Sequence, residues 1–328
     1  MSMNYTTLKE NADFFQQTLQ LIEESFNYSS ENSFEIDFYP LMEKNNHNNC
    51  HLLIKDKEVI GHIGVLEKEI TIKEESFSII MLGGIAIASK HRGQGLFTPF
   101  FEHVLNLYKE KSFYMLWSDQ IELYEKFDFY PCVDQFEYDQ SLEDAEEFIP
   151  TKLNTLHSND IEALSGIYNS QTDIRITRSL QDWDTLKKIT STDLYIKKEN
   201  NIIKNYFFMN KGEDLSEVLV EVGSFDDFEE LKKYGVLWSS EKLEEECDSL
   251  YATLIKISNP SSFKSFIRAF TNNLIQIEKI SKDNITFNFE SSIMELETNE
   301  FLTGVFGPNK FEELQDLKPF YISGLDSI

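Results

Sequence analysis

The chain has 328 residues, of which 41% are apolar and 13% aromatic, and its 57 acidic and 30 basic side chains give a formal net charge of −27. This length and apolar content predict a full buried core and two or three domains. The acidic residues are spread along the whole chain, which excludes nucleic acid as an expected partner and weakly favours a cationic amine near the surface.

The hydrophobic segments and the cysteines indicate whether a membrane span, a disulfide or a metal site is expected. No apolar run reaches the roughly 18 residues of a bilayer span, and the first residues lack a basic start and an apolar stretch. We therefore expect a cytoplasmic protein with no membrane partner. Cys50, Cys132 and Cys247 are far apart, which predicts buried or half-buried thiols rather than disulfides. We expect no metal, because His62 and His91 have no second ligand at metal-binding spacing.

The first 140 or so residues alternate between helical and strand patterns in a distinctive order. A helix is followed by a meander of three strands, with turns at Asp56-Lys57 and Glu74-Glu75, and then by a glycine-bearing loop. The predicted elements are a helix at 10–28, strands at 51–55, 58–72 and 77–88, a helix at 98–109, a strand at 113–117, a helix at 121–127 and a strand at 129–138.

The loop after the meander reads Arg92-Gly93-Gln94-Gly95 and leads into an amphipathic helix. Glycines let the backbone approach an anion without a Cβ in the way, and amides at the positive end of a helix suit a pyrophosphate. A Rossmann unit is not indicated, because the preceding strand belongs to a meander and the third glycine and following acidic residue are missing. A nucleotide-hydrolysing loop is not indicated either, since Gly-Lys-Ser/Thr is absent.

Two motifs carry a resemblance to a known family. Residues 92–97 match the acetyl-CoA signature Arg/Gln-x-x-Gly-x-Gly/Ala, except that Phe97 replaces the small last residue. Residues 123–129 are similar to Tyr-x-Lys/Arg-x-Gly-Phe, with Asp128 in the glycine position, a departure that a left-handed backbone tolerates. On these motifs, residues 1–145 resemble a GCN5-related N-acetyltransferase (GNAT) domain, which implies acetyl-CoA as cosubstrate.

The rest of the chain predicts two further parts. Residues 151–245 have helix and strand patterns but no Arg-x-x-Gly loop, so they resemble a degenerate GNAT-like domain that does not bind CoA. This layout is similar to Eis-type acetyltransferases, whose third domain is small and sterol-carrier-like. The predicted fold class is therefore α/β (α+β): a catalytic GNAT fold in 1–145, the degenerate domain in 151–245 and a small α+β sterol-carrier-like domain in 248–328. The resemblance also allows for a homo-oligomer.

The resemblance implies where acetyl-CoA would bind. Its carbonyl and pantetheine arm would pair with the backbone of Ile85, Ala86 and Ile87, in the manner of an added strand. Ser118 and Asp119, at the end of the next strand, would make a further contact. The pyrophosphate would lie on the amides of the loop, whose residues are Arg92, Gly93, Gln94, Gly95, Leu96, Phe97 and Thr98.

Acetyl transfer to an amine needs an acceptor for the amine proton and a donor for the departing thiolate. By resemblance Tyr124 is the acid. A phenol has a pKa of about 10 and a thiol a pKa of about 8.5, so proton transfer from the phenol to the thiolate costs about 2 kcal/mol. By resemblance the base is the α-carboxylate of Ile328. The apolar segment 320–328 independently predicts a docked tail. Two alternatives stay open: Tyr124 as a core aromatic, and the tail as a simple anchor.

The predicted function is an acetyl-CoA-dependent N-acetyltransferase that acts by direct attack of a primary amine of a small molecule or peptide. A non-catalytic acyl-CoA-binding regulatory module is the alternative, and transfer of a longer acyl chain is also open. Glu31, Glu35 and Asp37 lie in a stretch where acetyltransferases often place acceptor-binding side chains and could hold an ammonium there, but a flexible polar loop explains them equally well. The acceptor itself is not predicted, because acceptor pockets are built from variable loops.

Overall fold

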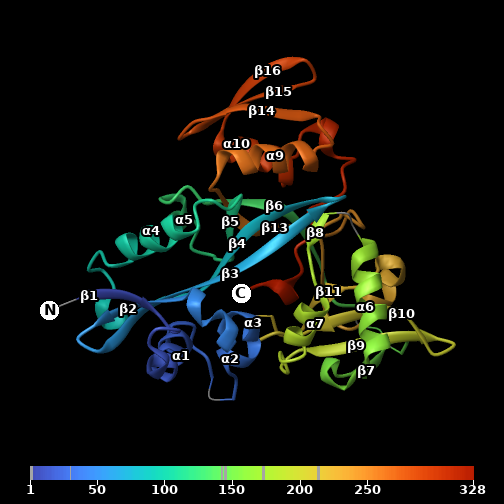
Figure 1. The fold of residues 1–328 in the computed structure, drawn as a ribbon. Coiled ribbons are helices and arrows are strands. Elements are labelled where there is room, and N and C mark those ends of the chain that lie inside the picture. Colours follow the sequence, from blue (N-terminus) through green and yellow to red (C-terminus); the bar gives the residue numbers. More distant parts are fainter. Residues whose placement is uncertain (1–2, 30, 142, 144–145, 172–173, 213–214) are drawn as a thin grey trace.

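One large sheet runs through most of the computed structural model, which describes residues 3–29, 31–141, 143, 146–171, 174–212 and 215–328 (Figure 1). Its strands are β1 (Met3–Thr7), β2 (Cys50–Lys55), β3 (Glu58–Ile72), β4 (Glu75–Ile87), β5 (Phe113–Leu116), β6 (Tyr130–Tyr138), β7 (Ile149–Thr151), β8 (Ile174–Ile176), β9 (Asp193–Glu199), β10 (Ile202–Met209), β11 (Val218–Val222), β12 (Val236–Ser239) and β13 (Asp248–Ile257). The spatial order is β1-β2-β3-β4-β5-β13-β6-β12-β11-β10-β9-β7, and β8 pairs with β3.

Helices cover this sheet, and a second, three-stranded sheet lies at one end of the molecule (Figure 1). The small sheet consists of β14 (Ile275–Ile280), β15 (Asn284–Phe289) and β16 (Ser292–Glu297). The helices are α1 (Phe15–Ser25), α2 (Phe34–Asp37), α3 (Tyr39–Met42), α4 (Phe97–Leu107), α5 (Ile121–Glu125), α6 (Ser158–Gln171), α7 (Leu180–Leu186), α8 (Phe228–Leu231), α9 (Pro260–Phe270) and α10 (Thr298–Phe306). Within the described residues, no helix combines the length and apolar character needed to cross a membrane.

We call residues 1–145, 151–245 and 248–328 the first, second and third parts. In the first part the predicted meander is confirmed as β2, β3 and β4. Asp56 and Lys57 both have positive φ, 50° and 69°, as a two-residue hairpin turn with the twist of its strands requires. The pattern did not predict β1, because its first three residues are exposed and only the ladder to β2 holds it as an edge strand.

The two faces of the first part's sheet have separate apolar cores. Because side chains alternate along a strand, Ile80 and Leu82 of β4 pack with α4 and α5, whereas Ile79 and Met81 pack with α1, α2 and α3. The second cluster continues into the third part through Phe263 and Phe266 of α9 and residues of α10. The third part is thus packed directly on the first.

Strand β13 lies between β5 and β6 of the first part, although chain order places its residues in the third part. Leu254 is opposite Leu116 of β5 on one side and Pro131 of β6 on the other. Sequence order gives no sign of this, because the strand returns to the first sheet only after the whole second part. Beyond β6 the sheet continues through β12 and β11, so the first and second parts share one sheet.

Replacing Leu254 by Ala tests whether β13 is a structural strand of the first part. Leu254 is fully buried, so its loss should lower the free energy of unfolding by ~2–5 kcal/mol. Leu250→Ala, at a position of the same strand that is 38% exposed, is the matched control and should cost much less. Urea unfolding measures both; equal effects would contradict the central placement of β13.

Candidate active site

Strand β4 separates from β5 at the centre of the first part. The two strands pair in parallel from Ile80–Tyr114 to Leu82–Leu116, where β5 ends, while β4 continues to Ile87. Among the described strands, none pairs with β4 on this side beyond Leu82. The stretch containing Ile85, Ala86 and Ile87 therefore has no strand partner on this side and can pair with an extended ligand, although the Ile87 carbonyl oxygen already accepts a hydrogen bond from Arg92 Nε.

The loop between β4 and α4 is exposed and has the backbone that an anion site needs. Gly93 and Gly95 have φ of 73° and 72°, a region that disfavours side chains, and a Cβ at either position would meet no atom within 4 Å. In the described part of the chain, nothing pairs with the amides of residues 93–96, and no side chain caps the start of α4. These free donors stand at the positive end of an 11-residue helix.

Arg92 is held across the base of this loop. Its Nε donates a hydrogen bond to the carbonyl oxygen of Ile87 at 2.9 Å, and Gln94 Nε2 donates to the carbonyl oxygen of Lys90 at 3.0 Å. Arg92 itself is exposed, and its two terminal amino groups have no partner among the described residues. The guanidinium is thus oriented at the loop with donors to spare for phosphate oxygens.

Phe97, which replaces the small residue of the signature, does not obstruct the loop. Its ring stacks on Phe101 with centroids 5.1 Å apart and meets the edges of Tyr124 and Phe127 at 6.2 and 5.6 Å. The side chain thus belongs to the core between α4 and α5. Asp128 has φ of 62°, so the expected left-handed backbone at this position is confirmed.

Tyr124 on α5 lies in an aromatic cluster, with Phe101 and Phe129 at centroid distances of 5.8 and 6.1 Å. Burial, helped by the charge of Asp119, raises the pKa of the Tyr124 phenol above its usual range, which keeps the group protonated and makes it a weaker acid than a phenol in water. No described residue pairs with its hydroxyl. Ser118 and Asp119 follow β5 directly, where Ser118 Oγ accepts from the amide of Gln120 at 3.0 Å.

The tail places Ile328 against β4. A Cβ built on Gly83 would lie 2.4 Å from the carboxyl carbon of Ile328 and 2.6 Å from a carboxyl oxygen, so only glycine allows this approach. Ile328 is 9% exposed, yet no described cation or hydrogen-bond donor pairs with its carboxylate. Figure 1 shows this end of the chain beside β3 and β4. A buried carboxylate without a partner is costly for folding and is typical of functional sites.

Two further polar groups border this region. His62 Nδ1 donates to the carbonyl oxygen of Gly84 at 2.7 Å, and burial lowers the pKa of His62 to about 4, so the ring is neutral. This hydrogen bond lies where the pairing of β3 with β4 shifts register and Gly84 has φ of 56°. Asp37 of α2 is 1% exposed, and its Oδ2 lacks a hydrogen-bond partner among the described residues. Of the three acidic candidates for acceptor binding, Asp37 is buried, Glu35 half-buried and Glu31 exposed.

Sequence reasoning missed the residues that hold the tail, above all Lys211 and Arg178, which are both buried in the second part. Lys211 follows the apolar end of β10, and a lysine at that place is the one local feature of the sequence that could have indicated its role.

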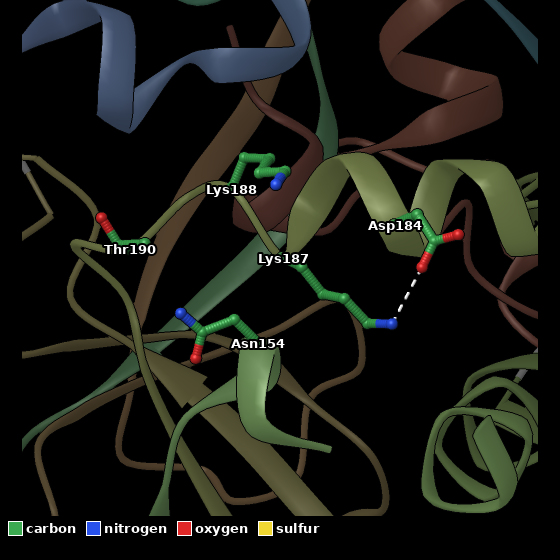
Figure 2. A pocket seen from close by; sticks show the side chains of 5 residues that line it. All are labelled: Asn154, Asp184, Lys187, Lys188 and Thr190. Carbon is green, nitrogen blue, oxygen red and sulfur yellow. Dashed lines mark hydrogen bonds and ion pairs between the residues drawn. The ribbon is translucent and has the colours of Figure 1, made fainter. Parts of the chain in front are cut away.

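A cavity of about 380 Å³ lies in the second part (Figure 2). It is lined by Asn154, Asp184, Lys187, Lys188 and Thr190, none of which is a predicted site residue. The described residues contain no cluster of His, Cys, Asp or Glu that could hold a metal. The predicted thiols are confirmed, with Cys50 and Cys132 buried and Cys247 half-buried.

Comparisons with known proteins agree with this geometry. The family model of the acetyltransferase (GNAT) domain matches residues 7–132, and a search of curated proteins finds no match. A solved GCN5-related N-acetyltransferase from Anabaena variabilis is 13% identical, with 100% of each chain covered and a TM-score of 0.61.

Two other solved structures cover 90% of this chain and 85% of their own. They are a probable N-acyltransferase from Enterococcus faecalis, 9% identical with a TM-score of 0.58, and Eis1 from Mycobacterium abscessus, 10% identical with a TM-score of 0.53. The family model thus identifies an acetyltransferase (GNAT) domain in residues 7–132, and the chain as a whole shares its fold with these N-acetyltransferase structures, Eis1 among them.

Proposed function

We propose that this protein transfers an acetyl group from acetyl-CoA to a primary amine by direct attack, with the α-carboxylate of Ile328 as base and Tyr124 as acid. The observation that carries the proposal is the buried, unpartnered carboxylate of Ile328 against Gly83, beside the point where β4 leaves β5. A carboxylate in that position can accept a proton from an amine that approaches a thioester bound along β4.

The cosubstrate fits the residues of the first part. The pantetheine arm would pair with the free edge of β4 at residues 85–87, and the pyrophosphate would accept hydrogen bonds from the loop amides and from Arg92. Ser118 and Asp119 would border the arm from the end of β5. The family uses acetyl-CoA, and a free strand edge and a donor-rich loop are what such a ligand requires.

The two proton-transfer groups come from opposite faces of the sheet. Ile328 belongs to the apolar cluster of α1, α2 and α3, and Tyr124 to that of α4 and α5. The Ile328 carboxylate would take the proton of the attacking amine as the new C–N bond forms. Tyr124 would give its proton to the sulfur as the C–S bond breaks, so the products are an amide and free CoA. No covalent enzyme intermediate is needed.

A cationic amine is the acceptor that the electrostatics favour. The net charge of −27 raises the local concentration of cations, and Asp37, whose charge also acts on Lys211, has a buried oxygen without a hydrogen-bond partner among the described residues. The rival, a non-catalytic acyl-CoA-binding module, predicts cofactor binding without release of free thiol. Calorimetric titration with acetyl-CoA beside a thiol-release assay over a panel of amines separates the two.

Arg92→Ala should weaken cofactor affinity before it affects turnover. Loss of a charge-assisted hydrogen bond to phosphate costs about 1.5 kcal/mol, or roughly a tenfold rise in Kd for CoA. Arg268→Ala, which removes an exposed arginine from α9, is the matched control for charge. An unchanged Kd in isothermal titration of Arg92→Ala would contradict binding at this loop.

Tyr124→Phe should lower kcat by roughly 10²–10⁴-fold, the usual contribution of a general acid, and leave the Kd of CoA nearly unchanged. The reason is that phenylalanine keeps the aromatic packing and removes only the proton donor. Tyr195→Phe, on β9 in the second part, controls for loss of a phenol elsewhere. Turnover equal to that of the unmodified enzyme would assign Tyr124 to the core alone.

Conversion of the Ile328 carboxyl group to an amide by semisynthesis should lower kcat by roughly 10²–10⁴-fold, because an amide cannot accept the amine proton. Binding of CoA should persist. The control is the same ligated protein with a free acid at Ile328, assayed at the same pH. Full turnover of the amide would remove Ile328 from the mechanism.

A further inference from the structure

A buried lysine of the second part donates hydrogen bonds to the last residues of the chain. Lys211 is 1% exposed, and its Nζ donates hydrogen bonds to the carbonyl oxygens of Gly324, Leu325 and Ser327 at 3.1, 3.0 and 2.5 Å, with Ser327 Oγ at 3.2 Å. Burial lowers the pKa of Lys211 to about 7, against the opposing charges of Asp326 and Asp37. The ammonium is therefore costly in this place, and the tail carbonyls supply the acceptors that it needs.

A second buried group of charges holds the same segment. Arg178 donates to Asp326 Oδ2 at 2.8 Å and, through both terminal nitrogens, to Glu221 at 2.9 and 2.5 Å. Glu221 also accepts from the hydroxyls of Tyr206, at 2.8 Å, and Ser323. The Arg178 guanidinium lies 4.0 Å from the ring centroid of Tyr168. Arg178 and Glu221 have fully buried side chains, and that of Asp326 is 3% exposed.

None of these charged groups pairs directly with the α-carboxylate of Ile328. Lys211 binds carbonyl oxygens up to Ser327, and no described cation lies within 4.0 Å of the Ile328 carboxylate. A cation directly on that carboxylate would stabilise its ionised form and make it a weaker base. The arrangement therefore fixes the position of the carboxylate through the neighbouring backbone, without a direct ion pair to the carboxylate itself.

We propose that Lys211 and the cluster of Arg178, Glu221 and Asp326 form a clamp by which the second part positions the Ile328 carboxylate in the first part. This assigns a positioning role to a part of the chain that has no phosphate loop of its own. Replacement of a buried ionic cluster by apolar side chains is often neutral or stabilising, so net stability is a weak explanation for this cluster. Its contacts with Ser323 and Asp326 support a role in positioning the tail. The catalytic consequence rests on the proposed role of Ile328 as base.

The clamp is tested first by a readout that does not depend on catalysis. In the full-length protein, carboxypeptidase A should release Ile328 slowly, because the tail is held in protein. Lys211→Met removes the ammonium at similar volume and should speed release by about tenfold or more, as expected when a local opening becomes easier. Asp326→Asn keeps the side-chain shape, should act in the same direction, and serves if Lys211→Met cannot be purified.

Two controls separate the clamp from general loosening. Lys204→Met removes an exposed lysine of β10, and Leu231→Ala destabilises the second part through a cluster that contains no tail residue. Both should release Ile328 at the unmodified rate. Unchanged release in Lys211→Met and Asp326→Asn, or equally fast release in Leu231→Ala, would overturn the clamp.

The kinetic arm tests the positioning role. Displacement of the base by about 1 Å should lower kcat of Lys211→Met by up to about 10²-fold, with the KM and Kd for the cosubstrate within about twofold. If Lys211→Met releases Ile328 quickly but keeps its kcat, and the Ile328 amide is inactive, the positioning role is overturned. The role of the Ile328 carboxylate as base is then retained. If instead the amide is fully active, the proposed base fails, and the carboxypeptidase result alone decides whether the clamp exists.

Discussion

The candidate active site depends on the point at which the parallel strands β4 and β5 stop pairing. Up to Leu82 and Leu116 the backbones of β4 and β5 satisfy each other; beyond that pair β5 ends, and one edge of β4 carries unpaired hydrogen-bonding groups. Such groups need a partner, and a strand-like ligand is one. Because β13 holds β5 from its other side, the opening stays between β4 and β5 rather than elsewhere in the sheet.

The tail connects all three parts to this opening. Phe320 lies among the rings of Phe113, Phe266 and Phe306 at centroid distances of 6.2–6.5 Å, which anchors the start of the tail to the first and third parts. The amide of Tyr321 then donates to the carbonyl oxygen of Ile174 at 3.1 Å, and residues 323–327 contact the buried charges of the second part. Ile328 finally reaches Gly83. Contacts with all three parts thus bring the Ile328 carboxylate to a defined place beside β4.

The charges around the tail separate two tasks that conflict when one residue performs both. A cation that pairs with a carboxylate holds it firmly but also lowers its affinity for a proton. Lys211 instead binds backbone oxygens, and Arg178 binds Asp326, two residues before the end. The cost of burying Arg178 and Lys211 is offset by Glu221 of the second part and by Asp326 and the carbonyl oxygens of the tail, so no ion pair to the Ile328 carboxylate is needed.

The sequence alone determined the local elements and motifs of the first part. Hydrophobic periodicity predicted α1, α4 and the meander, and short contiguous motifs predicted the loop of Arg92 and the left-handed Asp128, because each of these depends on neighbouring residues. The place of β13, the approach of Ile328 to Gly83 and the pairing of Lys211 with the tail were decided only by tertiary structure. Each joins residues more than a hundred positions apart, and a strand or a buried charge has the same local pattern whichever partner it finally meets.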